Sequence, residues 1–228
     1  MTQEQLDQWY DEEYFDQYPK HVRRIRQIVK NLEFDVLDLV CEFGCGLGHI
    51  QMAIAGKIQQ GVGIDVSEYA ITRAKESADM AGLSNLEFNT YDIIQLGEAE
   101  DYQSRFDKVL MMDISEHLYD DTLLKFLYSA KSILKPGGSL ILHTPNANYY
   151  LERMKARNFI LKQFESHIAV RNFQQHVPLL QSAGFSEIEV KYLPHYNRVL
   201  GTLDRVLSQI PMIKTLFQAR ILITANLP

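Results

Sequence analysis

A glycine-rich turn directly after an apolar run is the part of the chain best suited to bind a ligand. The run ends in Glu42 and Phe43, and glycines follow at alternating positions, Gly44, Gly46 and Gly48. Glycine permits positive φ angles and lets backbone N–H groups approach a ligand without an intervening Cβ. A flat, polar, nucleotide-type cofactor bound against the end of a strand requires both properties.

A second candidate ligand-binding residue, Asp65, ends the next short apolar run, Val62 to Ile64. At the tip of a neighbouring strand, its two carboxylate oxygens can accept hydrogen bonds from both hydroxyls of a ribose. Taken alone, Asp65 is explained equally well as an acid that ends a strand at a turn. Its register with the glycine-rich turn favours the ribose interpretation.

The glycine spacing disfavours a dinucleotide. The fingerprint G-x-G-x-x-G requires glycine at its sixth position. Counted from Gly44 that position is His49, and counted from Gly46 it is Gln51. A nicotinamide-dependent oxidoreductase is therefore kept only as an alternative from a different enzyme class.

The pattern that is present, an acid, an apolar residue and then G-x-G-x-G, resembles motif I of the class I S-adenosylmethionine (SAM)-dependent methyltransferases. Tyr91-Asp92-Ile93 resembles the adenine clamp of this family, and Phe106 to Asp113 resembles its fourth strand and motif. The resemblance covers about residues 36–193. It implies SAM as cofactor, S-adenosylhomocysteine as product, and these cofactor-binding residues: Glu42, Gly44, Cys45, Gly46, Gly48, Asp65, Val66, Asp92, Ile93, Met112 and Asp113.

Short apolar runs alternate with helical segments, which predicts an α/β fold. The resemblance implies a doubly wound, mostly parallel seven-stranded sheet with helices on both faces. Ser67 and Glu68 are expected to begin a helix, and residues 135–138 to end one. Strands are expected at 36–43, 62–64, 86–90, 106–113, 139–144, 188–193 and 217–225.

Two segments lie outside this core. With 228 residues and 46% hydrophobic content, the chain can bury its core as a single domain, 1–228. Within it, residues 1–31 are predicted as an N-terminal helical lid, although core packing explains their aromatic cluster equally well. Residues 146–176 exceed a tight β-to-α connection and are predicted as an acceptor-binding cap. The aromatic cluster comprises Trp9, Tyr10, Tyr14, Phe15 and Tyr18.

Two histidines, His117 and His167, are the candidate catalytic residues. A general base is needed only if the acceptor carries a proton at neutral pH, and it then contributes about 10²- to 10⁴-fold. The resemblance places His117 just after the fourth strand, where the methyl group should emerge, whereas His167 lies in the cap. The alternative for His117 is a hydrogen bond that shapes the cofactor pocket.

The order Asp113, Glu116, His117 and then His167 resembles the acids and histidines of metal-assisted small-RNA 2′-O-methyltransferases and of ubiquinone-pathway O-methyltransferases. This resemblance implies a divalent ion that gathers the acceptor hydroxyls. Asp113 departs from the glutamate of the RNA enzymes, and the same residue types occur in metal-free relatives. No resident metal is therefore expected. A metal or redox role is not expected either for Cys41 and Cys45, because two ligands do not make a zinc site.

Charge and hydropathy limit the partners. The net charge of −6 disfavours a protein that neutralises a long phosphate backbone, so nucleic acid is not an expected partner. Residues 1–16 are acidic and polar, unlike a signal peptide, and no window approaches the roughly 20 apolar residues of a membrane span. A cytoplasmic protein is expected.

Apolar residues between Val199 and Ile210 recur at helical spacing and predict an amphipathic helix. Burial of this apolar stripe against the sheet is the default expectation. The alternative is a peripheral membrane contact, in which Arg198 and Arg205 flank the stripe and Asp204 dilutes their charge.

Together these observations predict an enzyme that moves a methyl group from SAM to an oxygen or nitrogen atom of a small-molecule acceptor. Aligning the acceptor with the sulfonium methyl group contributes roughly 7–11 kcal/mol by positioning alone. The alternatives are a metal-assisted methyltransferase acting on RNA or on a quinone or lipid, the oxidoreductase above, and a non-catalytic SAM-binding subunit.

Overall fold

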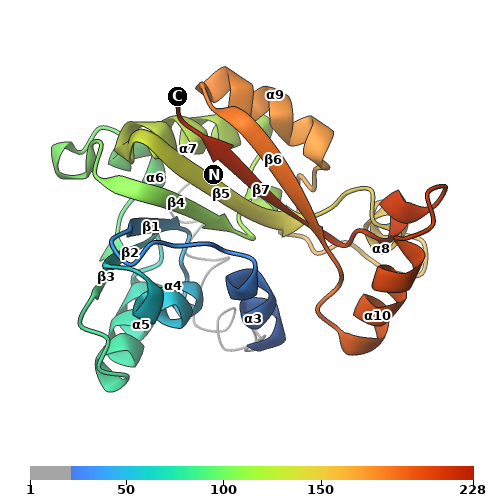
Figure 1. Ribbon diagram of the computed structural model, residues 1–228, viewed down its shortest axis with the longest axis horizontal. Coiled ribbons are helices and arrows are strands. Elements are labelled where there is room, and N and C mark those ends of the chain that lie inside the picture. The colour runs from blue at the N-terminus through green and yellow to red at the C-terminus, as the bar shows by residue number, and fades with distance from the viewer. Residues whose placement is uncertain (1–21) are drawn as a thin grey trace. The chain divides into compact units, whose positions relative to one another are not determined.

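The computed structural model describes residues 22–228. In this part of the chain the strands are β1 (Leu39–Phe43), β2 (Gln60–Asp65), β3 (Leu86–Thr90), β4 (Phe106–Met112), β5 (Leu134–Pro145), β6 (Ser186–Leu193) and β7 (Arg220–Asn226). They form one seven-stranded sheet in the order β3-β2-β1-β4-β5-β7-β6 (Figure 1). β2 is parallel to β1 and β3, whereas β7 is antiparallel to β5 and β6. The predicted α/β fold with a mostly parallel sheet is confirmed.

The described chain divides into two compact units. The first comprises residues 22–110 and 132–138, and the second comprises residues 111–131 and 139–228. The proposed lid over residues 1–31 lies mostly outside the described residues, as does its whole aromatic cluster. The single-domain organisation and the roles of lid and cap stay predictions.

Helices of the first unit cover the strands β1 to β3. α5 starts at Ser67, whose side chain accepts a hydrogen bond from the backbone N–H of Ala70, which confirms the predicted helix start. The buried face of α5 packs on Phe88 of β3 through small and branched side chains. The helices of this unit are α3 (Val22–Lys30), α4 (His49–Ile54), η1 (Ala55–Lys57), α5 (Glu68–Met80), α6 (Ile93–Leu96) and η2 (Glu100–Tyr102).

The first strand is shorter than predicted. Val36 and Leu37 are 71% and 69% exposed and precede β1. The side chains of Asp35 and Asp38 accept hydrogen bonds from the backbone N–H groups of Leu37 and Asp35, respectively, which closes a turn before the strand begins. The apolar character of residues 36 and 37 therefore did not indicate a strand.

The segment after β4 carries the remaining helices, η3 (Ser115–His117), α7 (Asp120–Ile133), α8 (Tyr150–Ala156), α9 (Phe173–Ala183), α10 (Arg198–Leu207) and η4 (Lys214–Phe217). α7 ends at Ile133, and residues 135–138, predicted as a helix stop, belong to the start of β5. α9 begins with a capping box at Asn172, so the predicted cap segment extends into its first turn.

The amphipathic helix forms as predicted, but within its apolar stripe the expected burial holds only in part, for the half-buried Leu200 and Leu207. Val199 and Val206 of α10 are 77% and 61% exposed. The buried face instead carries Asp204, which accepts hydrogen bonds from the Tyr149 hydroxyl and the His195 backbone N–H. These polar contacts fix the orientation of the helix. Among the described residues, no helix combines the length and the apolar content needed to cross a membrane.

Candidate functional site

The turn after β1 depends on its glycines. Gly44, Gly46 and Gly48 have φ angles of 65°, 51° and 71°, a region that side chains with a Cβ rarely adopt. At Gly48 a Cβ would also lie 2.6 Å from Cε1 of Phe88. The glycine-rich turn therefore has the positive φ angles that its glycines predicted.

Asp65 ties this turn to the end of β2. Its Oδ2 accepts a hydrogen bond from the Gly46 N–H at 2.8 Å, and its Oδ1 accepts one from the Ser67 N–H at 3.0 Å. The Asp65 carbonyl in turn accepts a hydrogen bond from the Tyr91 N–H after β3. A carboxylate has about four lone-pair sites, so the two backbone contacts leave acceptor capacity for a ligand. Burial raises the pKa of Asp65, opposed by the N–H groups of Ser67 and Gly46.

Glu42, at the end of β1, is a buried carboxyl group. It is 2% exposed, and its Oε2 has no hydrogen-bond partner among the described residues. Burial raises the pKa of Glu42 from 4.5 to about 8, although the charge of Arg24 lowers it. A buried polar atom without a partner next to a glycine-rich turn is the kind of group that a polar ligand satisfies.

The raised pKa of Glu42 predicts that stability falls with rising pH. Between pH 4.5 and about 8 the native state keeps a proton that the unfolded state has lost. The contribution of Glu42 to the free energy of unfolding then decreases by roughly 1.4 kcal/mol for each pH unit in this window. Glu42→Gln should flatten this dependence and raise the melting temperature above pH 8, measured by thermal unfolding across a pH series. The exposed Glu100→Gln is the control, and equal pH slopes for wild type and Glu42→Gln would contradict the prediction.

Other predicted cofactor-binding residues of the first unit lie around these groups. Asp92 is exposed and caps α6, with Oδ1 accepting a hydrogen bond from the Ile94 N–H, while Ile93 is buried. Cys45 is buried in the turn, and Val66 is partly exposed. Burial raises the pKa of both the Cys41 and Cys45 thiols. The structure thus brings the turn, Asp65 and the segment after β3 together, and their contacts with cofactor stay predictions.

In the second unit, Met112 and Asp113 follow each other at the end of β4. Met112 is buried, and Asp113 has a φ angle of 57°. Oδ1 of Asp113 lies 2.8 Å from Nδ1 of His143 and 3.3 Å from Nη1 of Arg220. Sequence reasoning missed His143 and Arg220; the signal for His143 was a histidine within an apolar strand.

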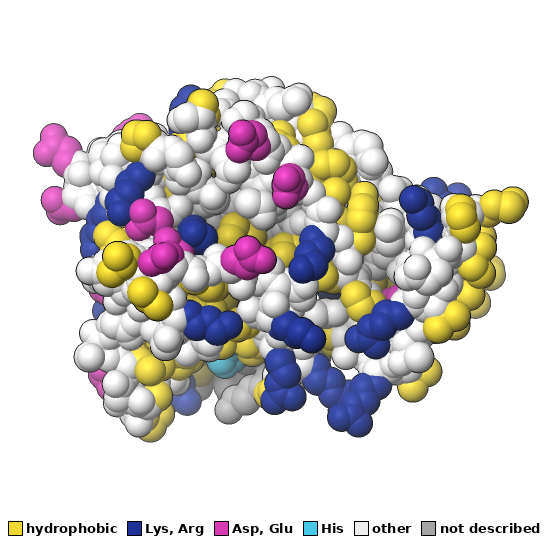
Figure 2. All heavy atoms as spheres, in the orientation of Figure 1, with side chains coloured by type: hydrophobic (Ala, Val, Ile, Leu, Met, Phe, Trp, Pro, Cys, Tyr) yellow, Lys and Arg dark blue, Asp and Glu magenta, His cyan; other side chains and the backbone are white. Residues whose placement is uncertain are grey.

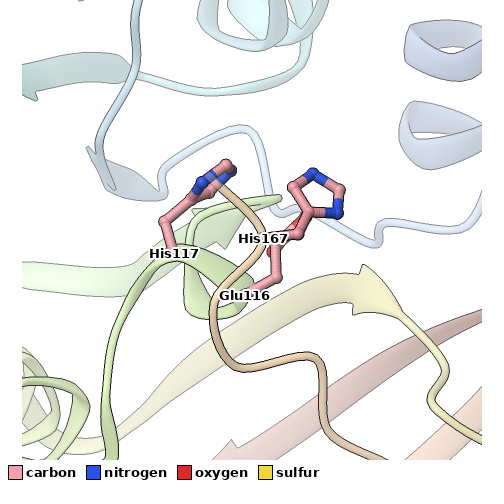
Figure 3. A group of neighbouring side chains, drawn as sticks. All are labelled: Glu116, His117 and His167. Atoms are coloured by element: carbon pink, nitrogen blue, oxygen red, sulfur yellow. The ribbon is translucent and has the colours of Figure 1, made fainter. Parts of the chain in front are cut away.

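Glu116, His117 and His167 converge in the second unit (Figure 3). One potential ligand atom from each lies within 4.8 Å of the others, and the two imidazole rings are nearly perpendicular with centroids 5.0 Å apart. Asp113, the remaining residue of the sequence pattern, lies outside this group, which we call the Glu-His-His group. A carboxylate with two imidazoles is a donor set that suits several divalent cations.

Hydrogen bonds hold the two segments of the Glu-His-His group together. Nδ1 of His117 lies 2.8 Å from the Ser166 carbonyl oxygen, and the Ala169 N–H donates to the Glu116 carbonyl oxygen. The buried Arg171, which sequence reasoning also missed, donates to the carbonyl oxygens of three residues of these segments and to the Asp120 carboxylate. The three residues are Ser115, Leu118 and Ala169.

Burial governs protonation in the Glu-His-His group. It raises the pKa of Glu116 to about 8, with the charge of Asp113 acting in the same direction. Burial lowers the pKa of His117, and it lowers that of His167 to about 4. Both imidazoles are therefore neutral at pH 7, which is the form that binds metal ions. Because the Ser166 carbonyl can only accept, the proton of neutral His117 resides on Nδ1.

Comparison with known proteins agrees with this architecture. Residues 34–191 match the family model described as a methyltransferase domain. A ubiquinone biosynthesis O-methyltransferase of Cereibacter sphaeroides is 32% identical over 123 residues, which cover 54% of this chain and 47% of that protein. The chain thus spans about half the length of the curated relatives that it matches.

Two solved structures illustrate the shared fold. Phosphoethanolamine N-methyltransferase 2 of Haemonchus contortus in complex with SAM is 16% identical with a TM-score of 0.68, covering 99% of this chain and 60% of that chain. A SAM-dependent methyltransferase of Archaeoglobus fulgidus is 18% identical with a TM-score of 0.67, covering 94% and 97% of the two chains. The family match over most of the sequence shows that the chain belongs to the methyltransferase-domain family, and its fold is that of the class I SAM-dependent methyltransferases.

Proposed function

We propose that the enzyme transfers the methyl group of SAM to an oxygen or nitrogen atom of a small-molecule acceptor. The proposal that SAM is the methyl donor rests on the hydrogen bond between Asp65 and the glycine-rich turn. This hydrogen bond holds backbone N–H groups and a carboxylate at the ends of the adjacent strands β1 and β2. The small-molecule acceptor is supported by the curated relatives, which act in ubiquinone biosynthesis by name.

Within the first unit, three carboxyl groups bind different parts of SAM. The remaining lone pairs of Asp65 accept from the ribose hydroxyls, and the exposed Asp92 accepts from the adenine amine. The unpartnered Oε2 of Glu42 accepts from a polar group of the cofactor beside the glycine-rich turn. The backbone N–H groups freed by glycine supply the complementary donors. Met112 and Asp113 belong to the second unit, and their contact with the cofactor stays a prediction from the sequence.

The chemical step needs little from the protein beyond alignment. The acceptor lone pair attacks the methyl carbon, the carbon–sulfur bond breaks, and its electron pair stays on sulfur as S-adenosylhomocysteine leaves. His167, whose pKa lies near 4, is a weak base at neutral pH. Proton removal by His167 alone is therefore a small contribution if the acceptor is a hydroxyl group.

The Glu-His-His group favours a second candidate, a metal-assisted O-methyltransferase. Nδ1 of His167 is buried without a hydrogen-bond partner among the described residues, and the buried carboxyl group of Glu116 accepts a hydrogen bond from the Thr144 hydroxyl at 2.9 Å. Both features fit residues that hold a divalent cation. Bound there, such a cation would lower the pKa of an acceptor hydroxyl. Glu116, His117 and His167 would hold it, and the Ser166 carbonyl would orient His117.

The proposed function is tested by methyl transfer from labelled SAM into a cell extract separated into small-molecule, lipid, RNA and protein fractions, with and without EDTA. Label in the small-molecule fraction supports the proposal, and its loss with EDTA supports the metal-assisted form. Label confined to RNA or protein would refute the acceptor class. Binding of SAM without label in any fraction would support a non-catalytic subunit instead.

Cofactor recognition is tested separately with Asp65→Asn. Loss of a charge-assisted acceptor corresponds to about 1.5–3 kcal/mol, so affinity for S-adenosylhomocysteine should fall about 10- to 150-fold in a calorimetric titration. Asp79→Asn, on the exposed side of α5, is the control and should bind as the wild type does. Unchanged affinity in Asp65→Asn, or binding of NAD(H) in place of S-adenosylhomocysteine, would contradict the assignment.

A further inference from the structure

The exposed face of α10 carries an apolar stripe, formed by Val199, Leu203 and Val206 at i, i+4 and i+7. These side chains are 77%, 42% and 61% exposed. The following segment adds Ile210 at 44% and Met212 at 94% exposure. Isolated exposed apolar residues are common on proteins, but a contiguous row on one helix face marks a contact surface.

The charges around this stripe have one sign. Exposed basic residues Arg198, Arg205 and Lys214 accompany it. The sequence from residue 190 to 228 contains one acidic residue, Asp204, and its side chain is fully buried by Tyr149 and the His195 backbone. Asp204 therefore does not dilute the exposed charge, in contrast to what its place in the sequence suggested. A chain of net charge −6 thus presents a basic, apolar surface at this helix.

The opposite face of the helix is fixed to the second unit. Gly201 is buried, and a Cβ at this position would collide with the carbonyl oxygen of His195. Asn197 caps the helix by accepting hydrogen bonds from the Val199 and Leu200 N–H groups. Figure 2 shows hydrophobic side chains gathered over this end of the second unit with Lys and Arg side chains beside them. The helix is therefore held with its stripe facing outward.

We propose that the α10 surface, consisting of the apolar stripe, Ile210, Met212 and the three basic residues, binds an anionic phospholipid membrane. A helix with aliphatic residues on one side and flanking basic residues lies in the membrane interface, with its apolar side chains among the acyl chains. Long arginine and lysine side chains reach the anionic headgroups from such a position. Each contributes about a fivefold gain in binding near an anionic surface.

Charge complementarity favours an anionic membrane over a protein as the partner of the α10 surface. The α10 surface combines aliphatic side chains with positive charge and no exposed acid, which matches a layer that is apolar inside and anionic outside. The aromatic residues that dominate protein interfaces are absent from α10 and from residues 208–214. The proposal is independent of the acceptor, since a membrane contact can be measured without methyl transfer.

The test is flotation of the 228-residue chain with phosphatidylcholine vesicles that contain or lack phosphatidylglycerol. We expect binding only when phosphatidylglycerol is present and a steep loss of binding at high salt. Arg198→Gln should weaken binding about fivefold, and Val199→Glu at least about tenfold. Retained S-adenosylhomocysteine binding verifies that each variant is folded.

Matched controls come from α5 of the first unit. Arg73→Gln makes the same charge change as Arg198→Gln, and Met80→Glu replaces a side chain that is 83% exposed. Neither should alter flotation. The proposal is overturned if the wild type does not float with either vesicle, floats equally with both, or loses binding as much in the controls. A homodimer in sedimentation velocity that Val199→Glu dissociates, without any flotation of the wild type, would assign the surface to a second copy instead.

Discussion

Gly48→Ala is expected to destabilise the protein by about 2–4 kcal/mol and to lower its affinity for S-adenosylhomocysteine by at least about 100-fold. A residue with a Cβ pays about 1–2 kcal/mol for the left-handed conformation that Gly48 adopts. Its Cβ would also lie 2.6 Å from Phe88 and 3.2 Å from the Cβ of Ala74. Because both contacts lie in the buried core of the first unit, the turn has to move, and the backbone N–H groups move with it. Thermal unfolding and a calorimetric titration measure the two effects.

Gly82→Ala is the matched control for this experiment. Gly82 has a φ angle of 68°, close to that of Gly48, but a Cβ there would meet nothing within 4 Å. Gly82→Ala should therefore lose only the stability that the left-handed backbone conformation costs a residue with a Cβ, and it should bind the cofactor as the wild type does. A second variant, Phe88→Leu in the Gly48→Ala background, should recover part of the affinity by making space. Equal destabilisation by Gly48→Ala and Gly82→Ala would show that the contact with Phe88 is unimportant.

The second large effect concerns the Glu-His-His group. If it holds a divalent cation, EDTA and His167→Asn should each lower methyl transfer about 100-fold, since a metal contributes several kcal/mol to the reaction. S-adenosylhomocysteine binding should not change. His195→Asn alters a half-buried histidine of the same unit outside the group and serves as control. Full activity in both EDTA and His167→Asn would refute the metal-assisted form.

Glu116→Gln distinguishes metal binding by Glu116 from a purely structural role of this residue. Without metal, this variant removes a buried carboxyl group that is costly to ionise, so its melting temperature should exceed that of the wild type above pH 8. With Mg²⁺, Mn²⁺ or Zn²⁺, only the wild type should gain stability, and more so as pH rises because the cation displaces the proton of Glu116. Equal shifts in wild type and variant would mean that the cation binds elsewhere.

Local features of the fold and site were predictable from sequence. The glycine-rich turn, the Ser67 helix start and the strand at 86–90 depend on neighbouring residues, and each is confirmed. The contacts of Asp113 were not predictable, because His143 and Arg220 lie far along the chain and only folding brings them to it. The role of Arg171 was not predictable for the same reason.

The orientation of α10 could not be predicted from the sequence for a different reason. Hydrophobic periodicity identifies which residues share a helix face, but not which face is buried. Here a single acid, Asp204, finds two hydrogen-bond donors in Tyr149 and His195, and these contacts turn the apolar stripe outward. A buried charged residue outside the periodic pattern therefore decided the orientation.

The hydrogen bonds of Arg171 have a consequence for ligand affinity. They join the loop that carries Glu116 and His117 to the segment that follows His167 through three backbone carbonyl groups. The conformational entropy of these two segments is therefore lost when the chain folds and not when a ligand arrives. A ligand that needs both segments meets a preorganised arrangement, so its binding free energy is not reduced by the ordering of loops.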